Sequence, residues 1–359
     1  MTLVAAFREQ GIPFLLGDFL ITAQGAEAGT RKKICRVAPN LAVAWTGHQI
    51  AAEVVVNAMH KHFAGRRATK AELEQFLTTF PPTDLAQFDL HLIGWVLCAD
   101  AHCFRWNSSW PHEVFYAPHH YAGSGGPRFI SLAGEGGSRG DVPKGHPARL
   151  VLNTVTQLMV DELDSQKNRA AGFGYAYEIL FADGAEFVYV DDVTFIFAED
   201  EFSAAGKYLR TILVPRFYRY ASFGEMTIVQ TQTLRSDSGT VRPQVERNLI
   251  TPPFDLPESE IQSLLARIVR PDFPLAPVGP RAYLLISPIR DADTTEARPI
   301  APLIVAQWPD DETKIFEIGF EPSSDQSAVD GTLQLRMPGR ELLEHAFELA
   351  VTDPDLSGA

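Results

Sequence analysis

Long apolar runs, long basic stretches and paired cysteines are all missing from this chain of 359 residues. No apolar run reaches the roughly 18 residues that a helix needs to span a bilayer, so we expect no membrane insertion. The first residues lack the basic segment, apolar core and small-residue cleavage site of a secretory signal. We therefore expect a cytoplasmic protein.

Cysteine usage and histidine spacing argue against disulfides and zinc. The three cysteines form no C-x-x-C motif, and an odd number without a signal favours reduced thiols: Cys35, Cys98 and Cys103. Four histidines lie close to Cys103, but not at the spacing of structural zinc sites: His102, His112, His119 and His120. On a strand, adjacent histidines point to opposite faces, so we expect no metal.

Positive charge is also scarce. The chain has 45 Asp and Glu against 31 Lys and Arg, which gives a formal net charge of -14. This charge repels phosphate backbones, so we expect no binding to nucleic acids. The segment GEGGSRG at 134–140 matches a dinucleotide fingerprint only loosely, because no βαβ unit surrounds it. We interpret it as a surface loop.

Length and composition indicate a globular protein of two domains. Hydrophobic residues make up 45% and charged residues 21% of the chain, ordinary values for such proteins, and single cores rarely grow past about 250 residues. Prolines become frequent beyond residue 200, which indicates loops between short strands or extended segments. We place the boundary near 200–212, giving domains at 1–205 and 206–359, and expect the second to contain β-structure.

Strands dominate the first 50 residues. Segments 2–8 and 12–22 are typical of a hairpin around the turn Glu9–Gln10–Gly11. Two short apolar segments on either side of Pro39–Asn40 indicate a second hairpin. Four strands are therefore expected before any helix.

Helices follow, in a pair. Apolar positions over 48–63 recur with the helical period. Thr69 and Glu72 form a capping box for a second helix, which Pro81–Pro82 ends. The pattern then returns to strands from 88 to 121.

Beyond this point a glycine-rich stretch covers 123–145, and a further helix is expected over 149–163. Strands then surround the Asp183–Gly184 turn. Later helical patterns lie at 258–268 and 340–350. Helices in pairs between groups of strands predict an α+β layered fold with antiparallel sheets rather than alternating βαβ units.

The second residue carries the most distinctive chemistry. Removal of Met1, which methionine aminopeptidase performs when the next side chain is small, leaves Thr2 with a hydroxyl and a free α-amine. An α-amine has an ordinary pKa of about 7.7–8.0, so it can take the hydroxyl proton without a histidine. Such a site needs a nearby cation and an acid to hold that cation, and Lys33 and Asp18 are the candidates.

The chain resembles the proteasome-type N-terminal nucleophile (Ntn) hydrolases, most closely bacterial HslV-like and proteasome beta-like subunits. The resemblance covers about residues 1–200 and is carried by short motifs: Met1–Thr2, Arg8, Gly11, Gly17–Asp18, Thr22, the run Lys32 to Arg36, Gly47 and Gly123 to Pro127. It implies a four-layer αββα sandwich, followed here by a second, β-containing C-terminal domain.

The resemblance also implies roles for single residues. Thr2 is the nucleophile, Lys33 lowers the pKa of its amine, Asp18 pairs with Lys33, and Ser124 hydrogen-bonds near the amine. The backbone N–H that holds the oxyanion falls on Ala44, where the family has glycine. No cofactor is required.

Two features depart from the family pattern. The acid and serine that complete the family's site have no secure counterpart, and Asp164 and Ser165 are the nearest. The segment 134–147 stands where the family has a long helix that contributes to ring contacts.

The expected activity is therefore that of a threonine peptidase or amidohydrolase acting on a peptide or protein. It proceeds through an acyl-enzyme on Thr2, in a homo-oligomer with a possible ATPase partner. Two alternatives remain open. One is a catalytically inactive, proteasome-like scaffold that binds partners, and the other is a small-molecule amidase on the same fold.

Overall fold

The computed structural model describes part of the chain: residues 2–23, 25–79, 85, 87–136, 151, 155, 158, 167–174, 176–190, 192–202, 208–237, 240–268, 282–287, 289–291, 303–307, 317–322 and 331–336. It divides into two compact units. The first comprises Met1–Asp191, Ser222–Thr227 and Leu249–Ile261, and the second comprises Asp192–Ala221, Ile228–Asn248 and Gln262–Ala359. The boundary between 205 and 206 stays a prediction.

The first sheet of the first unit begins with the expected hairpin. Strands β1 (Val4–Glu9) and β2 (Ile12–Asp18) pair antiparallel across Gln10 and Gly11. Both turn residues have positive φ, 49° and 82°, as a two-residue hairpin turn with the twist of its strands requires. The antiparallel sheet is completed by three further strands in the order β10-β1-β2-β11-β12: β10 (His120–Ala122), β11 (Tyr177–Asp183) and β12 (Glu186–Tyr189).

The predicted strand over 12–22 is interrupted. It ends at Asp18, and a separate strand β3 (Leu20–Ala23) pairs with β4 (Ala26–Thr30). Six strands therefore precede the first helix, not four. The sequence of β4, AEAGT, contains no large apolar residue and no β-branched residue before Thr30, so the pattern rules missed it.

The second sheet contains the second expected hairpin. It runs in the antiparallel order β5 (Ile34–Ala38), β6 (Leu41–Gly47), β7 (Leu90–Leu97), β8 (Ala101–Asn107), β9 (Phe115–Tyr116), with Pro39 and Asn40 between β5 and β6. One buried cluster takes side chains from both sheets, among them Val4, Leu15, Ala44, Ile93 and Leu180. The two sheets of this unit therefore face each other across an apolar core.

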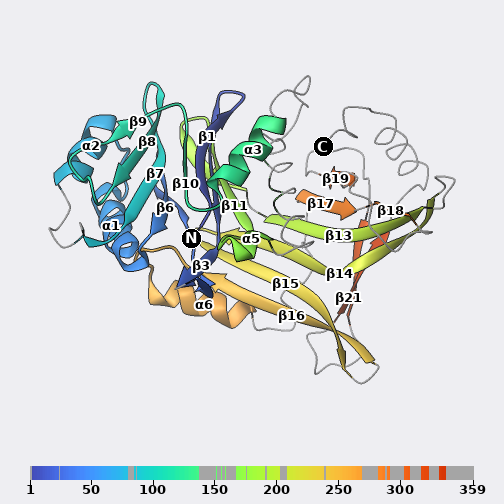
Figure 1. Ribbon diagram of the computed structural model, residues 1–359. Coiled ribbons are helices and arrows are strands. Elements are labelled where there is room, and N and C mark those ends of the chain that lie inside the picture. Colours follow the sequence, from blue (N-terminus) through green and yellow to red (C-terminus); the bar gives the residue numbers. More distant parts are fainter. Residues whose placement is uncertain are drawn as a thin grey trace. The chain divides into compact units, whose positions relative to one another are not determined.

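Helices α1 (Gln49–Phe63) and α2 (Lys70–Thr79) cover the other face of the second sheet (Figure 1). Their buried residues, such as Val55, Met59 and Leu73, share a cluster with side chains of β5 to β8. The capping box is confirmed, because Thr69 N donates to Glu72 Oε2 at 3.0 Å and Glu72 N donates to Thr69 Oγ1 at 3.2 Å. The predicted stop at Pro81–Pro82 lies outside the described residues.

Helix α3 (Gly126–Gly136) lies in the glycine-rich stretch, and it corrects the interpretation of 134–140 as a surface loop for residues 134–136. Its buried Phe129 packs on Phe7 of β1, with ring centroids 5.1 Å apart, so this contact places α3 against the first sheet. A short helix α5 (Lys167–Ala170) follows. Most of the helix expected over 149–163, and both Asp164 and Ser165, lie outside the described residues.

The second unit has both long and short strands: β13 to β16 have 11 to 16 residues, longer than expected, whereas β17 to β21 have 3 to 6, as expected. Its larger sheet has the order β16-β15-β14-β13-β17-β19, with β18 beside β13. The strands are β13 (Asp192–Phe202), β14 (Tyr208–Phe223), β15 (Met226–Asp237), β16 (Thr240–Ile250), β17 (Ala282–Ser287), β18 (Ile289–Asp291) and β19 (Leu303–Gln307). A separate pair joins β20 (Glu317–Pro322) to β21 (Gly331–Arg336).

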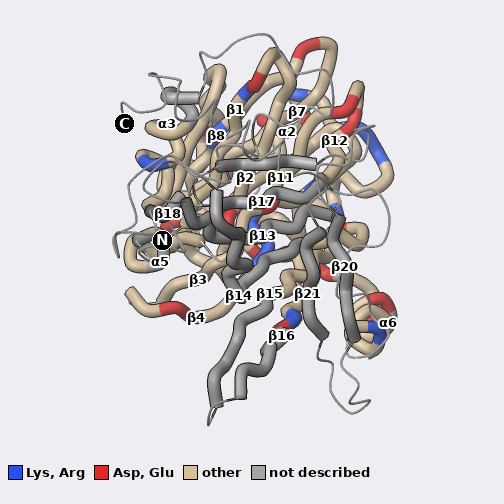
Figure 2. The backbone as a smooth tube through the Cα atoms, turned by 90° about the vertical axis from the view of Figure 1, so that its right-hand side faces the viewer, with Lys and Arg blue, Asp and Glu red and all other residues tan. Residues whose placement is uncertain are grey.

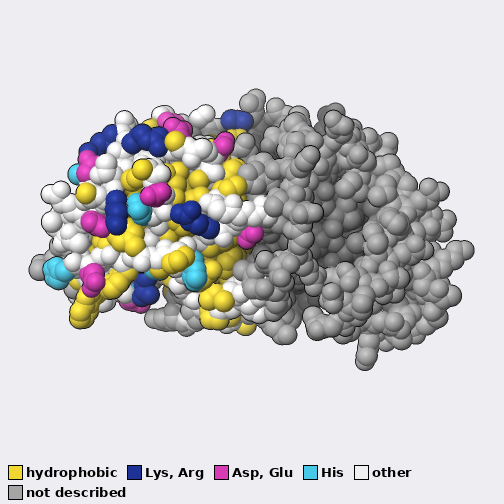
Figure 3. Space-filling view, turned by 90° about the horizontal axis from the view of Figure 1, so that it is seen from above, with side chains coloured by type: hydrophobic (Ala, Val, Ile, Leu, Met, Phe, Trp, Pro, Cys, Tyr) yellow, Lys and Arg dark blue, Asp and Glu magenta, His cyan; other side chains and the backbone are white. Residues whose placement is uncertain are grey.

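Helix α6 (Glu258–Ile268) confirms the helix expected there, whereas 340–350 lies outside the described residues. The chain is thus an α+β protein in which antiparallel pairing predominates. Among the helices that the structure describes, none has the length and apolar character to cross a membrane. Basic and acidic residues are scattered in short stretches along the described chain (Figure 2). The face seen in Figure 3 likewise mixes charged and apolar side chains among the described residues.

Candidate functional site

Thr2, Asp18 and Lys33 come together in the first unit. Thr2 lies two residues before β1, Asp18 ends β2, and Lys33 directly precedes β5. The Thr2 hydroxyl donates to Asp18 Oδ1 at 2.5 Å, and Lys33 Nζ donates to the same oxygen at 2.7 Å. All three side chains are buried, with residue exposures of 2%, 0% and 1%. The hydroxyl and the ammonium group therefore share one carboxylate.

Strand register explains how Asp18 reaches Thr2. Val4 pairs with Gly17, so the next step along the hairpin brings Leu3 opposite Asp18. Leu3 N donates to Asp18 Oδ1 at 2.9 Å, and Asp18 N donates to Leu3 O at 3.1 Å. Gly174 N donates to Asp18 Oδ2 at 2.9 Å. Two backbone amides, the hydroxyl and the ammonium thus fix this carboxylate, and such hydrogen bonds to an ionised acceptor are strong ones.

Lys33 is held by both its side chain and its main chain. Its Nζ also donates to Leu20 O, and its carbonyl accepts from Trp45 N at 3.0 Å. Burial lowers the pKa of Lys33, while the charge and hydrogen bond of Asp18 act in the opposite direction. A Cβ on Gly17 would lie 2.9 Å from Ile34 Cγ2 and 3.6 Å from Lys33 Cβ. The glycine before Asp18 therefore makes room for Lys33 and for Ile34 at the start of β5.

The glycine stretch holds the carbonyl of Thr2. Gly125 N donates to Thr2 O at 3.0 Å, and Ser124 Oγ donates to it at 3.5 Å. Gly123 has a φ of 86°, and a Cβ there would lie 2.1 Å from Thr2 O. Only glycine allows this approach. The contact that the structure gives for Ser124 is thus with the carbonyl of Thr2.

Ala44 is placed differently from the other predicted site residues. It pairs with Ile34 on β5 and with Ile93 on β7, and its methyl group is part of the core between the sheets. The N–H of Trp45 points toward Lys33, so the alternation of the ladder turns the Ala44 N–H toward β7. The Ala44 N–H therefore faces away from β5 and from Lys33, which directly precedes it.

Gly47, the last residue of β6, is exposed. It lies two residues after Trp45, so the alternation along the strand points its N–H to the same side as the N–H of Trp45. Its φ is 105°, and a Cβ would lie 1.9 Å from Asp89 O. The sequence contained a signal for it, since a glycine here ends an apolar strand directly before a helix.

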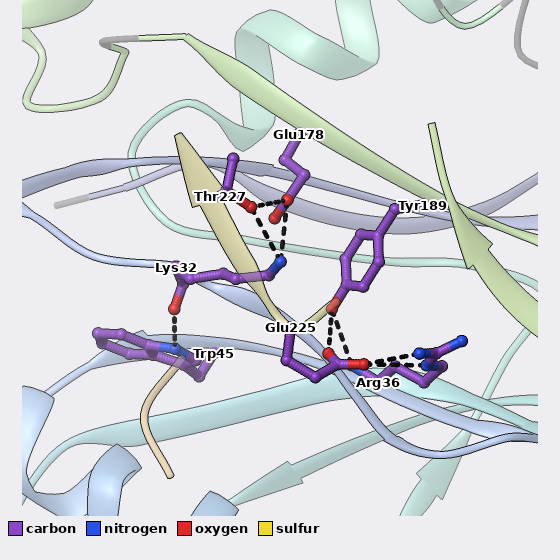
Figure 4. A network of polar contacts seen from close by, with 7 residues as sticks. All are labelled: Lys32, Arg36, Trp45, Glu178, Tyr189, Glu225 and Thr227. Atoms are coloured by element: carbon purple, nitrogen blue, oxygen red, sulfur yellow. Dashed lines mark hydrogen bonds and ion pairs between the residues drawn. The ribbon is translucent and has the colours of Figure 1, made fainter. Parts of the chain in front are cut away.

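A second buried ion pair was not found from the sequence. Lys32 Nζ lies 3.0 Å from Glu178 Oε1, and both side chains are fully buried (Figure 4). Thr227, 195 residues from Lys32, accepts from Lys32 Nζ at 3.0 Å and donates to Glu178 Oε1 at 2.6 Å. No local pattern reveals a contact across that separation.

The described residues bring together a hydroxyl, a carboxylate and a lysine, but no group of three His, Cys, Asp or Glu side chains placed to hold a metal. This arrangement can fix a hydroxyl beside a buried positive charge, which suits nucleophilic catalysis. Neither a protein-family model nor a curated protein sequence matches the chain.

Proposed function

We propose that the chain is a threonine-type N-terminal nucleophile hydrolase, which cleaves peptide or amide bonds through an acyl-enzyme on Thr2 once Met1 has been removed. The observation that carries this proposal is the buried cluster in which Asp18 accepts from both Thr2 Oγ1 and Lys33 Nζ. The three residues are those to which the family resemblance assigns these roles.

We extend the proposal to the fold of the first unit. Helices α1 and α2, the two facing sheets and α3 supply the layers of a proteasome-type αββα sandwich. In this arrangement the hairpin of β1 and β2 delivers both the nucleophile and the acid, because Leu3 lies opposite Asp18.

Catalysis begins with transfer of the Thr2 hydroxyl proton to the free α-amine of the same residue. Oγ1 then forms a bond to the substrate carbonyl carbon, and the carbonyl oxygen takes the negative charge. The carbon–nitrogen bond breaks as the leaving amine receives the proton from the α-ammonium, which leaves an ester on Thr2. Water then gives a proton to the α-amine and attacks the ester, so that the acid departs and Oγ1 regains its proton.

Lys33 and Asp18 set the electrostatics of the first step. The positive charge of Lys33 disfavours protonation of a neighbouring amine, so the α-amine stays available as a base near neutral pH. Asp18 keeps Lys33 in place and accepts from the main-chain N–H of Leu3. The nucleophile, its base and their orienting groups thus all lie within one hairpin and one adjoining segment.

The oxyanion needs a backbone donor. Within β6 the Ala44 N–H is turned toward β7, whereas the Gly47 N–H points to the same side as the N–H of Trp45, which donates to Lys33 O. We therefore propose the N–H of Gly47, rather than that of Ala44, for this role.

The decisive experiment is reaction of the purified chain with an epoxyketone, which needs both the hydroxyl and the amine of an N-terminal threonine. We expect an intact mass that lacks Met1, and a single adduct that peptide mapping places on Thr2. Thr2→Ala abolishes the adduct and all hydrolysis of a peptide panel, while Thr78→Ala on helix α2 reacts normally. Retained Met1, or full activity in Thr2→Ala, would rule the mechanism out.

One observation favours an inactive scaffold as the second candidate. Thr2 is only 2% exposed, so the hydroxyl is covered in the structure described here. An unreactive chain with Met1 still attached would support the scaffold. Reaction of small acyl amides alone, with no peptide cleaved, would instead identify an amidase.

A further inference from the structure

We propose that the segment Ser222–Thr227, which holds the end of β14, the turn Gly224–Glu225 and the start of β15, is a positioning element of the Thr2 site. Through Thr227 and Glu225 it fixes the segment 32–36, which carries Lys33. The inference rests on the proposed function, and it assigns a role in catalysis to a part of the chain that follows the region of family resemblance. Four observations on the first unit support it.

The first is the hydrogen-bonding position of Thr227. Its hydroxyl accepts from Lys32 Nζ at 3.0 Å and donates to Glu178 Oε1 at 2.6 Å, so it closes a triangle with the ion pair (Figure 4). Glu178 Oε2 has no hydrogen-bond partner among the described residues. Lys32 and Thr227 therefore supply the donors that hold this buried carboxylate.

The second observation is a set of hydrogen bonds from Glu225 and Tyr189 to Arg36, at the other end of the segment 32–36. Glu225 Oε1 accepts from Arg36 Nε at 3.0 Å, and Glu225 Oε2 accepts from the Tyr189 hydroxyl at 2.8 Å. The Tyr189 hydroxyl in turn accepts from Arg36 N at 3.1 Å. The Tyr189 ring also lies under Lys32, with Nζ 3.8 Å from the ring centroid. The segment Ser222–Thr227 thus holds the chain on both sides of Lys33.

The third observation is that the two ion pairs, Lys32–Glu178 and Lys33–Asp18, lie next to each other. Lys32 and Lys33 are adjacent in sequence, and their partners Glu178 and Asp18 lie on the paired strands β11 and β2. In that pairing Glu178 is opposite Gly17, the residue before Asp18. The position of one lysine therefore constrains the position of the other.

The fourth observation is the lack of regular structure at the lysines. Residues 31–33 lie between β4 and β5 and belong to neither strand. Removal of the Thr227 hydroxyl takes one hydrogen-bond acceptor from the buried Lys32 ammonium and one donor from Glu178. Buried polar groups that lose a hydrogen bond are costly, so this loss favours movement of Lys32 out of its place. Lys33, joined to it by one peptide bond, moves with it. A shift of about 1 Å at a catalytic group can slow a reaction by about 10²-fold.

The test measures acylation of Thr2 by an epoxyketone in Thr227→Val, which keeps the side-chain shape but removes the hydroxyl. We expect the limiting rate to fall by more than about tenfold, while the probe concentration at half-maximal rate stays the same. Thr227→Ser, which restores the hydroxyl, recovers the wild-type rate. Thr79→Val, an exposed hydroxyl on helix α2, serves as the matched control and reacts like the wild type.

Two outcomes overturn the proposal: a folded Thr227→Val variant that is acylated at the wild-type rate, or a Thr227→Ser variant as slow as Thr227→Val. If circular dichroism shows Thr227→Val to be unfolded, Glu225→Gln carries the same test at Arg36. The expected result there is again a lower limiting rate.

The proposed function can fail separately. If the wild type forms no adduct on Thr2, the side-chain nitrogen signal of Lys33 in NMR spectra still reports its surroundings. We expect that signal to shift in Thr227→Val and to return in Thr227→Ser. An unshifted Lys33 signal in folded Thr227→Val contradicts the positioning role, whatever the activity.

Discussion

At the scale of single residues, Asp18 connects the nucleophile to the rest of the protein. Its Oδ1 accepts from a hydroxyl, a backbone amide and an ammonium, and its Oδ2 accepts from Gly174 N. A carboxylate with so many donors is fixed in place and provides the counter-charge that the buried Lys33 requires. Loss of this single charge thus affects stability and catalysis together.

Asp18→Asn is expected to destabilise the protein by about 3–5 kcal/mol, the usual cost of leaving a buried charge unpaired. The pKa of Lys33 then falls further, because the charge of Asp18 opposes the effect of burial. A lysine whose pKa is lowered in the folded state destabilises it while protonated, and this effect is relieved as pH rises toward the ordinary 10.5. Urea unfolding at several pH values should therefore show a cost that shrinks with rising pH.

The matched control is Asp255→Asn. Asp255 also accepts from a lysine, Lys61, at 2.7 Å, but both side chains are largely exposed. Exposed pairs contribute little to stability, so this variant should unfold almost like the wild type. Equal losses in the two variants would contradict the role given to burial at Asp18.

At the scale of elements, the junction of β6 and α1 brings strand, glycine and helix start within a few residues. Gly47 ends β6, His48 N donates to Asp89 O at 2.8 Å, and the His48 side chain accepts from Ala51 N as the helix cap. The positive φ of Gly47 turns the chain from the sheet into the helix. Geometry at this position therefore decides where α1 begins.

Gly47→Ala should lower the unfolding free energy by more than about 1 kcal/mol, the lower end of the strain expected for a positive φ. A further loss comes from the Cβ, which would lie 1.9 Å from Asp89 O. Gly65→Ala is the control, because Gly65 has a φ of 69° but open space around its Cβ. Thermal unfolding of both variants measures the difference, and an equally mild loss at the two glycines would refute the crowding.

Local signals explain which elements could be predicted. The turn at Gln10–Gly11, the hairpin around Pro39–Asn40 and the Thr69 capping box are each specified by neighbouring residues. Strand β4 contains no large apolar residue, so it has no local signal of that kind. Helix α3 is amphipathic, but the glycines at its ends obscured its helical period in the sequence.

The residues of the candidate site likewise divide into those that local sequence signals predicted and those that only the fold brings together. Thr2 was found from its own chemistry and from its motif, together with Asp18 and Lys33. Glu178 and Thr227 could not be found, because Thr227 is 49 residues from Glu178 and 195 residues from Lys32 along the chain. The direction of the Ala44 N–H depends on the pairing of β6 with both neighbours, which a single sequence does not determine.

At the scale of the whole molecule, the first unit buries two adjacent lysines, and buried charges are costly unless they are paired. Burial raises the pKa of Glu178, whereas the charge of Lys32 and the hydrogen bond from Thr227 lower it. Buried ion pairs can be less stable than apolar side chains of similar volume. We therefore interpret the second pair as a device for placing the chain rather than for stabilising it.

This interpretation predicts the outcome of apolar replacement. A triple variant, Lys32→Met with Glu178→Leu and Thr227→Val, should be as stable as the wild type or more stable by about 1–4 kcal/mol, whereas Lys32→Met alone should lose about 3–5 kcal/mol. Glu178 binds its proton more tightly when folded, so its ionisation costs stability as pH rises from the ordinary 4.5 through the raised pKa. The triple variant lacks this titration. Its stability relative to the wild type, measured by urea unfolding between pH 4 and pH 8, should therefore grow with pH. A triple variant clearly less stable than the wild type would show that the ion pair itself stabilises the fold.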